Sequence, residues 1–304
     1  MPEQECCGEC FHVVLCMGAR VRIYEGKVTV LSEPVVRECP YMRREYGVTR
    51  ADKSVVKRVI EEKIRRYGLF TPRRRLVFDR VVLFGSSEII SWCVENGLLD
   101  AAVIVCDGAG TIIASNPRLI QGVGARMNGV LRTCPIREVI SRVEGMGGIV
   151  LDPLSARIDQ VRGGRRAVEE GYKRIAVTVI GPMAHEIHEI RRLEEKLGVD
   201  VTVFSTCNTL ASPRDQCALE KADYVCTSAS AWIRRSLGPR ALLQLGVSIP
   251  VLIMTGKCKR LILEYLRGVD EQVLVRRARL PFETPSTPVS VLEQGEENQC
   301  EKQE

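Results

Sequence analysis

Cysteine is the residue type in this sequence that most strongly suggests chemistry. The 304 residues include 13 cysteines, an odd number, which is high for a chain without a recognisable secretory signal and low for a disulfide scaffold. In a reducing compartment, thiols are expected to bind metals or clusters, or to do redox chemistry, more often than to form disulfides. Other cysteines are expected to be small apolar residues of the core.

The first candidate group lies at the N-terminus and consists of Cys6, Cys7, Cys10 and Cys16. The spacing Cys7-x-x-Cys10 lets two thiolates reach one ion or cluster. The alternative is a flexible extension that carries solvent-exposed thiols.

The second candidate group consists of cysteines at the ends of expected elements. Cys39 precedes a proline, Cys106 closes an apolar strand, and Cys226 lies near the end of another strand. Ligands of open α/β sheets gather outside the carboxyl ends of the strands. We therefore predict that Cys39, Cys106 and Cys226 bind a metal ion or an iron–sulfur cluster, with Cys207 as a fourth candidate. The alternative is that they are core thiols.

A glycine-rich loop, Asp107-Gly108-Ala109-Gly110-Thr111, follows the strand that ends at Cys106. Successive backbone N–H groups of such a loop can form a nest for an anion. We predict that Asp107, Gly108, Gly110 and Thr111 bind a phosphate or carboxylate group. In that interpretation Cys106 or Asp107 is a nucleophile or general base. The alternative is a tight turn that requires positive φ.

The three histidines disfavour hydrolase chemistry. His185 and His188 are spaced to share a metal on one helix, but a polar helix surface is the favoured interpretation. His12 is the only other histidine, so a histidine-based triad has few candidates. No G-x-S-x-G motif is present.

The charge distribution predicts an anionic partner. The net charge is +6 overall, −5 over residues 281–304 and +8 between residues 43 and 80. Arg73-Arg74-Arg75 offers guanidinium groups that bind carboxylates or phosphates, so we expect an anionic cofactor or an acidic protein face. Aromatic residues make up 5% of the chain, which disfavours nucleic acid. The alternative is a solvated helix face.

The elements that position these residues predict an α/β fold. An N-terminal β-hairpin over residues 11–36 and a helix over 52–67 precede the strand 101–106. From Lys173 onward, four strand–helix units predict a doubly wound, mostly parallel sheet; its strands are 174–179, 199–205, 223–227 and 249–254, and its helices 184–197, 213–221, 230–245 and 257–267.

The domain organisation follows from this pattern. We expect a cysteine-rich extension over 1–10, an N-terminal α/β domain over 11–152, a Rossmann-like α/β domain over 153–280, and a disordered acidic tail over 281–304. No apolar run approaches the roughly 20 residues of a membrane span, and we expect a cytoplasmic protein.

Several segments between about residue 11 and residue 268 together form a family pattern. The most specific segment is Cys106-Asp107-Gly108-Ala109-Gly110-Thr111. The other segments are Val36-Arg37-Glu38-Cys39-Pro40, Phe84-Gly85-Ser86-Ser87-Glu88-Ile89, Ile158-Asp159-Gln160, Ile175-Ala176-Val177-Thr178-Val179, Ala241-Leu242-Leu243-Gln244 and Ser248-Ile249-Pro250. Taken in this order, they resemble the methanogenesis marker protein 8 family of methanogenic archaea.

The resemblance implies an accessory protein of methanogenesis. It suggests a role in the maturation, activation or assembly of methyl-coenzyme M reductase or its cofactors, with that enzyme or its maturation machinery as partner. One alternative is a small-molecule enzyme of coenzyme biosynthesis that binds its ligand at Asp107–Thr111. The other is a metal-free assembly scaffold.

Overall fold

The computed structural model describes residues 10–291. Its central feature is an eight-stranded sheet with the order β11-β12-β10-β9-β8-β4-β5-β7. The strands are β4 (Ala101–Cys106), β5 (Gly110–Ala114), β7 (Ile149–Val150), β8 (Arg174–Ile180), β9 (Asp200–Thr206), β10 (Tyr224–Cys226), β11 (Leu243–Leu245) and β12 (Val251–Ile253). The four central strands β10, β9, β8 and β4 are parallel, whereas both outer pairs join antiparallel. The sheet is therefore mixed, and the expected parallel arrangement holds for its centre.

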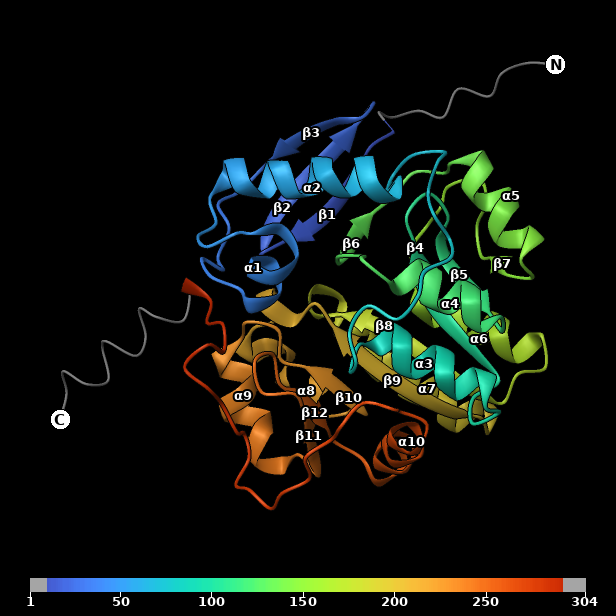
Figure 1. The fold of residues 1–304 in the computed structure, drawn as a ribbon. Helices are drawn as coiled ribbons and strands as arrows, with labels where there is room; N and C mark the ends of the chain where they lie inside the picture. Colours follow the sequence, from blue (N-terminus) through green and yellow to red (C-terminus); the bar gives the residue numbers. More distant parts are fainter. Residues whose placement is uncertain (1–9, 292–304) are drawn as a thin grey trace.

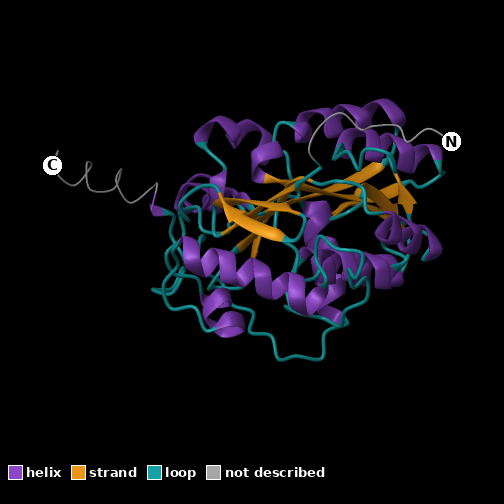
Figure 2. Cartoon of the chain, turned by 90° about the horizontal axis from the view of Figure 1, so that it is seen from above, coloured by secondary structure: helices purple, strands orange, loops and turns teal. Residues whose placement is uncertain are grey.

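Helices cover both faces of this sheet (Figure 2). One face packs against α3 (Ser86–Glu95), α4 (Pro117–Gly124), α5 (Arg137–Gly145) and α10 (Gly256–Arg267). The other packs against α6 (Gln160–Glu169), α7 (Glu186–Leu197), α8 (Gln216–Leu219) and α9 (Ala231–Leu237). Successive residues of β4 alternate between the two cores, because strand side chains point to opposite faces. The central strands consequently read as continuous apolar runs.

A second, antiparallel sheet is built mainly from the N-terminal segment (Figure 1). It has the order β3-β2-β1-β6 and comprises β1 (His12–Cys16), β2 (Ala19–Tyr24), β3 (Lys27–Val30) and β6 (Val130–Arg132). The helix α2 (Lys53–Tyr67) packs on it through Val56, Val59 and Ile60, and α1 (Pro40–Tyr46) lies beside it. The predicted hairpin and helix 52–67 are confirmed; α2 begins after Asp52, whose carboxylate accepts a hydrogen bond from the Val55 N–H.

The expected domain boundary near residue 152 falls within the main sheet. Strands β4, β5 and β7 precede this point, and β8 to β12 follow it. The helical region expected around 230–245 is shorter in the structure. The helix α9 ends at Leu237, a 3-10 helix over Gly238–Arg240 follows, and β11 begins at Leu243. The α-helix stops there because Pro239 interrupts the helical hydrogen-bond pattern.

Residues 281–291, which we expected to begin the disordered tail, pack against the main fold. Ser290 is buried and forms a bridge with Val36, and its N–H donates to the carbonyl of Ala229. Glu283 pairs with the buried Arg234 at 2.9 Å. These contacts stabilise the packed position of residues 281–291, although the polar composition of the segment suggested disorder. The rest of the tail lies outside the described residues.

Within residues 10–291, none of the helices combines the length and the apolar character needed to cross a bilayer.

Candidate functional site

Four cysteines lie where the second sheet meets the strand ends of the main sheet. Cys16 ends β1, Cys39 precedes α1, Cys207 follows β9 and Cys226 ends β10. Electrostatic interactions link them in a chain, from Cys16 to Cys39, from Cys39 to Cys226 and from Cys226 to Cys207. We call these four residues the thiol seam. The fold thus gathers side chains from positions 16 to 226 into one region.

Hydrogen-bond donors surround the sulfurs of Cys16 and Cys207. Burial raises the pKa of both thiols to about 11. The side chain of Asn128 opposes this effect at Cys16, and the Gly129 N–H and the Thr206 hydroxyl oppose it at Cys207. A β-carbon on Gly129 would lie 3.1 Å from the β-carbon of Cys207, so the absence of a side chain lets this backbone approach the sulfur.

The other two sulfurs have donors of their own. Burial raises the pKa of Cys39 and of Cys226. The backbone N–H groups of Met42 and Tyr41, in the first turn of α1, oppose the effect at Cys39. The backbone and side chain of Ser228 oppose it at Cys226, where Ser228 Oγ lies 3.8 Å from Cys226 Sγ. All four sulfurs are therefore placed to accept hydrogen bonds.

Cys93, Cys106 and Cys258 have a different environment. All three are fully buried, burial is the largest cause of their raised pKa values, and no hydrogen-bond donor opposes it. The Cys106 thiol instead donates to the carbonyl of Asp107 at 3.4 Å. These cysteines have the character of core thiols.

Lys63 of α2 is a buried cation whose charge acts on Cys16 and Cys207 of the thiol seam. Its side chain is 2% exposed, and its ammonium group donates to the Arg126 carbonyl at 2.8 Å and to the Asn128 side chain. Burial lowers the pKa of Lys63 to about 8, while Cys16 and Cys207 oppose the decrease. Within the described residues Lys63 has no carboxylate partner. The sequence could have predicted that Lys63 is buried, since residue 63 continues the apolar helical spacing of Val56 and Ile60.

The predicted metal set is only partly brought together. Cys39 and Cys226 interact, as described above, but Cys106 lies in the core and interacts with Asp107, Arg74 and Arg142. In residues 10–291, no group of three His, Cys, Asp or Glu side chains is placed to hold one metal ion. Cys16 was expected in the N-terminal cysteine group, and Lys63 was not among the predicted site residues.

The Asp107–Thr111 loop forms the turn of the β4–β5 hairpin. Asp107 Oδ1 accepts a hydrogen bond from Arg74 Nε at 2.7 Å, and Oδ2 accepts one from the Phe70 N–H at 2.5 Å. Thr111 Oγ1 donates to Gln160 at 2.7 Å and accepts from the Asp159 N–H at 2.8 Å.

The two glycines of this loop also make contacts within the protein. The Gly108 N–H donates to Thr133 Oγ1 at 2.8 Å. Gly110 has φ +72°, and a β-carbon there would lie 2.2 Å from the Ala156 carbonyl oxygen. The prediction of an anion site at Asp107, Gly108, Gly110 and Thr111 finds no support in this geometry, because these groups bond within the protein. The geometry favours the tight-turn alternative.

The N-terminal cysteine group is divided in the structure. Cys6 and Cys7 lie outside the described residues, Cys10 forms a disulfide with Cys134, and Cys16 belongs to the thiol seam. The disulfide differs from the metal site suggested by Cys7-x-x-Cys10, because it occupies the Cys10 thiol.

The remaining candidates lie on the surface or in the core. His185 is exposed and His188 half-buried at the start of α7, which fits the polar helix surface. Of the three arginines, Arg73 and Arg75 are exposed. Arg74 is fully buried against Asp107, so only two of these guanidinium groups face solvent.

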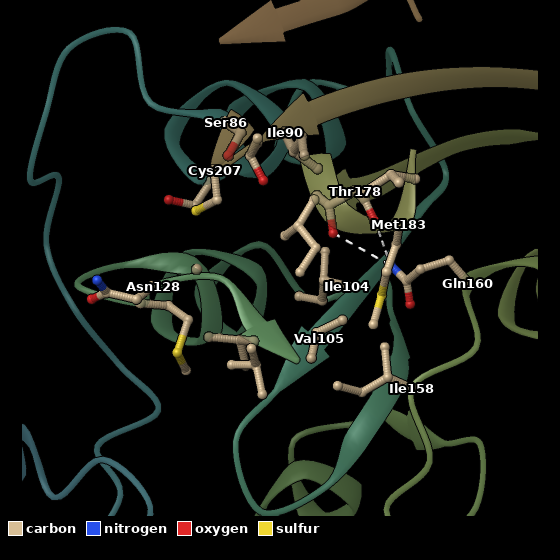
Figure 3. Close-up of a pocket in the computed structure, with 18 of the residues that line it drawn as sticks. Ser86, Ile90, Ile104, Val105, Asn128, Ile158, Gln160, Thr178, Met183 and Cys207 are labelled. Carbon is tan, nitrogen blue, oxygen red and sulfur yellow. Dashed lines mark hydrogen bonds between the residues drawn. The ribbon is translucent and has the colours of Figure 1, made fainter. Parts of the chain in front are cut away.

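A cavity of about 140 Å³ borders the thiol seam at Cys207 (Figure 3). Thr178 of β8 and Thr206 of β9 place it at the carboxyl ends of parallel strands. This is where open α/β sheets bind ligands.

The fold and this site define a mixed α/β protein in which two sheets meet at a group of cysteines. A family model described as "Uncharacterized protein conserved in archaea (DUF2099)" matches residues 12–267, and the chain belongs to this family. It is similar to "Uncharacterized protein MJ0054" of Methanocaldococcus jannaschii (strain ATCC 43067 / DSM 2661 / JAL-1 / JCM 10045 / NBRC 100440). The identity is 35% over 279 residues, which cover 91% of this chain and 98% of that protein.

Proposed function

We propose that the thiol seam binds an iron–sulfur cluster and that the protein is an accessory factor of methanogenesis. The observation that carries the proposal is the gathering of Cys16, Cys39, Cys207 and Cys226, two of which, Cys16 and Cys207, interact with the buried Lys63. The four cysteines share Cys39 and Cys226 with the predicted set, whereas the third predicted residue, Cys106, lies in the core.

The chemistry of the four sulfurs supports a cluster. Iron–sulfur clusters are held by four cysteine thiolates, and hydrogen bonds to the sulfurs set the reduction potential. A cluster does not require three thiolates to converge on one ion, because its thiolates bind different iron atoms separated by bridging sulfides.

Charge supports the same assignment. A buried ammonium group without a counter-ion is costly. Lys63 has two oxygen acceptors, but its opposing charges come from Cys16 and Cys207. Four thiolates give a bound cluster a net negative charge. Lys63 would balance part of that charge inside the protein.

The methanogenesis role rests on the sequence resemblance described above. We propose that the protein acts in the maturation, activation or assembly of methyl-coenzyme M reductase or its cofactors. An exposed segment supports a role that involves a protein partner: Leu274 and Val275 are 85% and 82% exposed, and Arg276, Arg277 and Arg279 follow them. Such a segment suits a partner with an apolar contact and an acidic rim.

Reconstitution tests the cluster. Anaerobic incubation of the reduced protein with ferrous iron and sulfide is expected to give a stable, dithionite-reducible chromophore with an electron paramagnetic resonance signal. Cys207→Ser should reduce the yield severely, whereas the exposed Cys217→Ser is the matched control and should not. Wild-type protein that takes up no iron and sulfide together would contradict the proposal.

The partner requires a separate measurement. Purified protein should bind purified methyl-coenzyme M reductase or its maturation complex, with affinity that falls as salt rises. Replacing Leu274 and Val275 by serine should weaken binding, with Leu154→Ser as an exposed control. Failure of both enzyme preparations to bind would remove this part of the proposal without affecting the cluster.

A further inference from the structure

The cavity beside Cys207 is formed by elements from both halves of the chain. Thr178 and Val105 come from the ends of β8 and β4, Ser86 from the start of α3, and Asn128 from the segment before β6. Its volume of about 140 Å³ is close to the roughly 150 Å³ of an engineered apolar cavity that binds benzene. The space therefore suits a molecule of roughly six non-hydrogen atoms.

The two sides of the cavity differ in chemistry (Figure 3). On one side lie Ile158, Met183 and Gln160, and on the other Ser86, Asn128 and Cys207. The amide of Gln160 is already committed, since its nitrogen donates to the Thr178 carbonyl at 2.6 Å and its oxygen accepts from Thr111. This side consequently presents mainly apolar surface.

The opposite side retains one hydroxyl without a partner in the described part of the chain. No hydrogen bond of the Ser86 hydroxyl is found within the described residues. The neighbouring Asn128 side chain already bonds to Lys63 and Cys16, and Cys207 has the Gly129 N–H and Thr206 as donors. A ligand with one polar end would satisfy the Ser86 hydroxyl and place its apolar part against Ile158 and Met183. Ligand sites commonly combine a mostly apolar wall with a few such polar groups.

We infer that this cavity is a binding site for a small aliphatic molecule with a single hydrogen-bonding head group. The head group lies toward Ser86, Asn128 and Cys207, and the chain lies against Ile158 and Met183. This site goes beyond the proposed function and does not depend on it, because the cavity is formed by the protein alone. If the thiol seam holds a cluster, the ligand lies next to one of its cysteines.

Butan-1-ol is the probe, with butane-1,4-diol as the matched comparison. The second hydroxyl of the diol would be buried without a partner, so the diol should bind at least about tenfold more weakly. The measurement is methyl NMR of protein labelled at methionine, in metal-free and in iron-reconstituted samples. Met127 and Met183 line the cavity. They should shift saturably and show intermolecular nuclear Overhauser effects to the butyl chain, whereas Met254 should not.

Two variants sharpen the test. Ile158→Trp fills the cavity and should abolish the saturable shifts. Leu154→Trp, four residues away and 84% exposed, should leave them unchanged. Absence of saturable shifts at Met127 and Met183 in the wild type would overturn the inference, as would equal binding by Ile158→Trp. If Ile158→Trp does not fold, the wild-type nuclear Overhauser effects decide the question. Iron content is measured separately, so failure of the cluster leaves this result intact.

Discussion

Arg74 and Asp107 form a fully buried ion pair, with 2.7 Å between Arg74 Nε and Asp107 Oδ1. The pair joins the basic loop after α2 to the end of β4. Arg74 also donates to the carbonyls of Gly122 and Val123, so one guanidinium group connects three segments. A residue expected to face an anionic partner and one expected to bind a ligand instead stabilise each other.

Asp107→Ala should strongly destabilise the fold. It leaves the guanidinium of Arg74 buried without its counter-charge and the Phe70 N–H without an acceptor. Breaking such a buried pair costs about 3–5 kcal/mol. The free energy of unfolding from urea titrations measures the loss. Glu38→Gln removes the exposed pair with Arg43 and should cost less than about 1 kcal/mol. Equal costs would contradict a structural role for Asp107.

Gly110→Val should impair folding whether or not a ligand is present. The new side chain would clash with the backbone at Ala156 and would sit at positive φ, so a loss of several kcal/mol is expected, at least about 3. Thermal unfolding and soluble yield measure this effect. Gly145→Ala is the control, because a β-carbon there meets no atom within 4 Å. A fully stable Gly110→Val protein would be inconsistent with this structure.

His12 should make the protein sensitive to acid. Burial lowers the pKa of His12, and Asp107 opposes the decrease. The unfolded chain therefore binds this proton more readily than the folded one. Stability is retained above the ordinary value near 6.5 and falls as the pH drops below it. Urea titrations from about pH 7.5 to about pH 5.5 should show the loss. His12→Asn should flatten it, and the exposed His185→Asn should not.

Lys63→Met should lower the reduction potential of a reconstituted cluster. A nearby positive charge stabilises the reduced state, which carries one more negative charge. Removing that charge favours the oxidised state. Potentiometric titration measures the shift, and the exposed Lys57→Met is the control. A potential unchanged by Lys63→Met would place the cluster away from this ammonium group.

The sequence predicted the elements better than their pairing. Continuous apolar runs located the strands around Val103, Val177 and Val203, because strands buried on both faces have long apolar runs. The β4–β5 hairpin was missed because its Gly-rich turn resembled an anion nest. Nothing local predicts that β6, near residue 130, pairs with β1, since that contact depends on tertiary packing.

The candidate site, too, could be predicted only where its residues lie at the ends of expected elements. The rule that ligands gather at strand ends placed Cys226 and Cys207 correctly at the ends of β10 and β9. It also placed Cys106 correctly at the end of β4, but the chain turns there directly into a buried hairpin and the Cys106 side chain lies in the core. Cys16 belongs to the other sheet, so its approach to Cys39 could be found only from the assembled fold.

Iron and acid-labile sulfide content of anaerobically isolated protein tests the central claim most directly. We expect the wild type to contain as much sulfide as iron, and we expect Cys106→Ala to contain both as well. We expect both to be lost in Cys16→Ser, Cys39→Ser, Cys207→Ser and Cys226→Ser. Wild-type protein without iron and sulfide, or a cluster that survives all four substitutions but not Cys106→Ala, would contradict this claim.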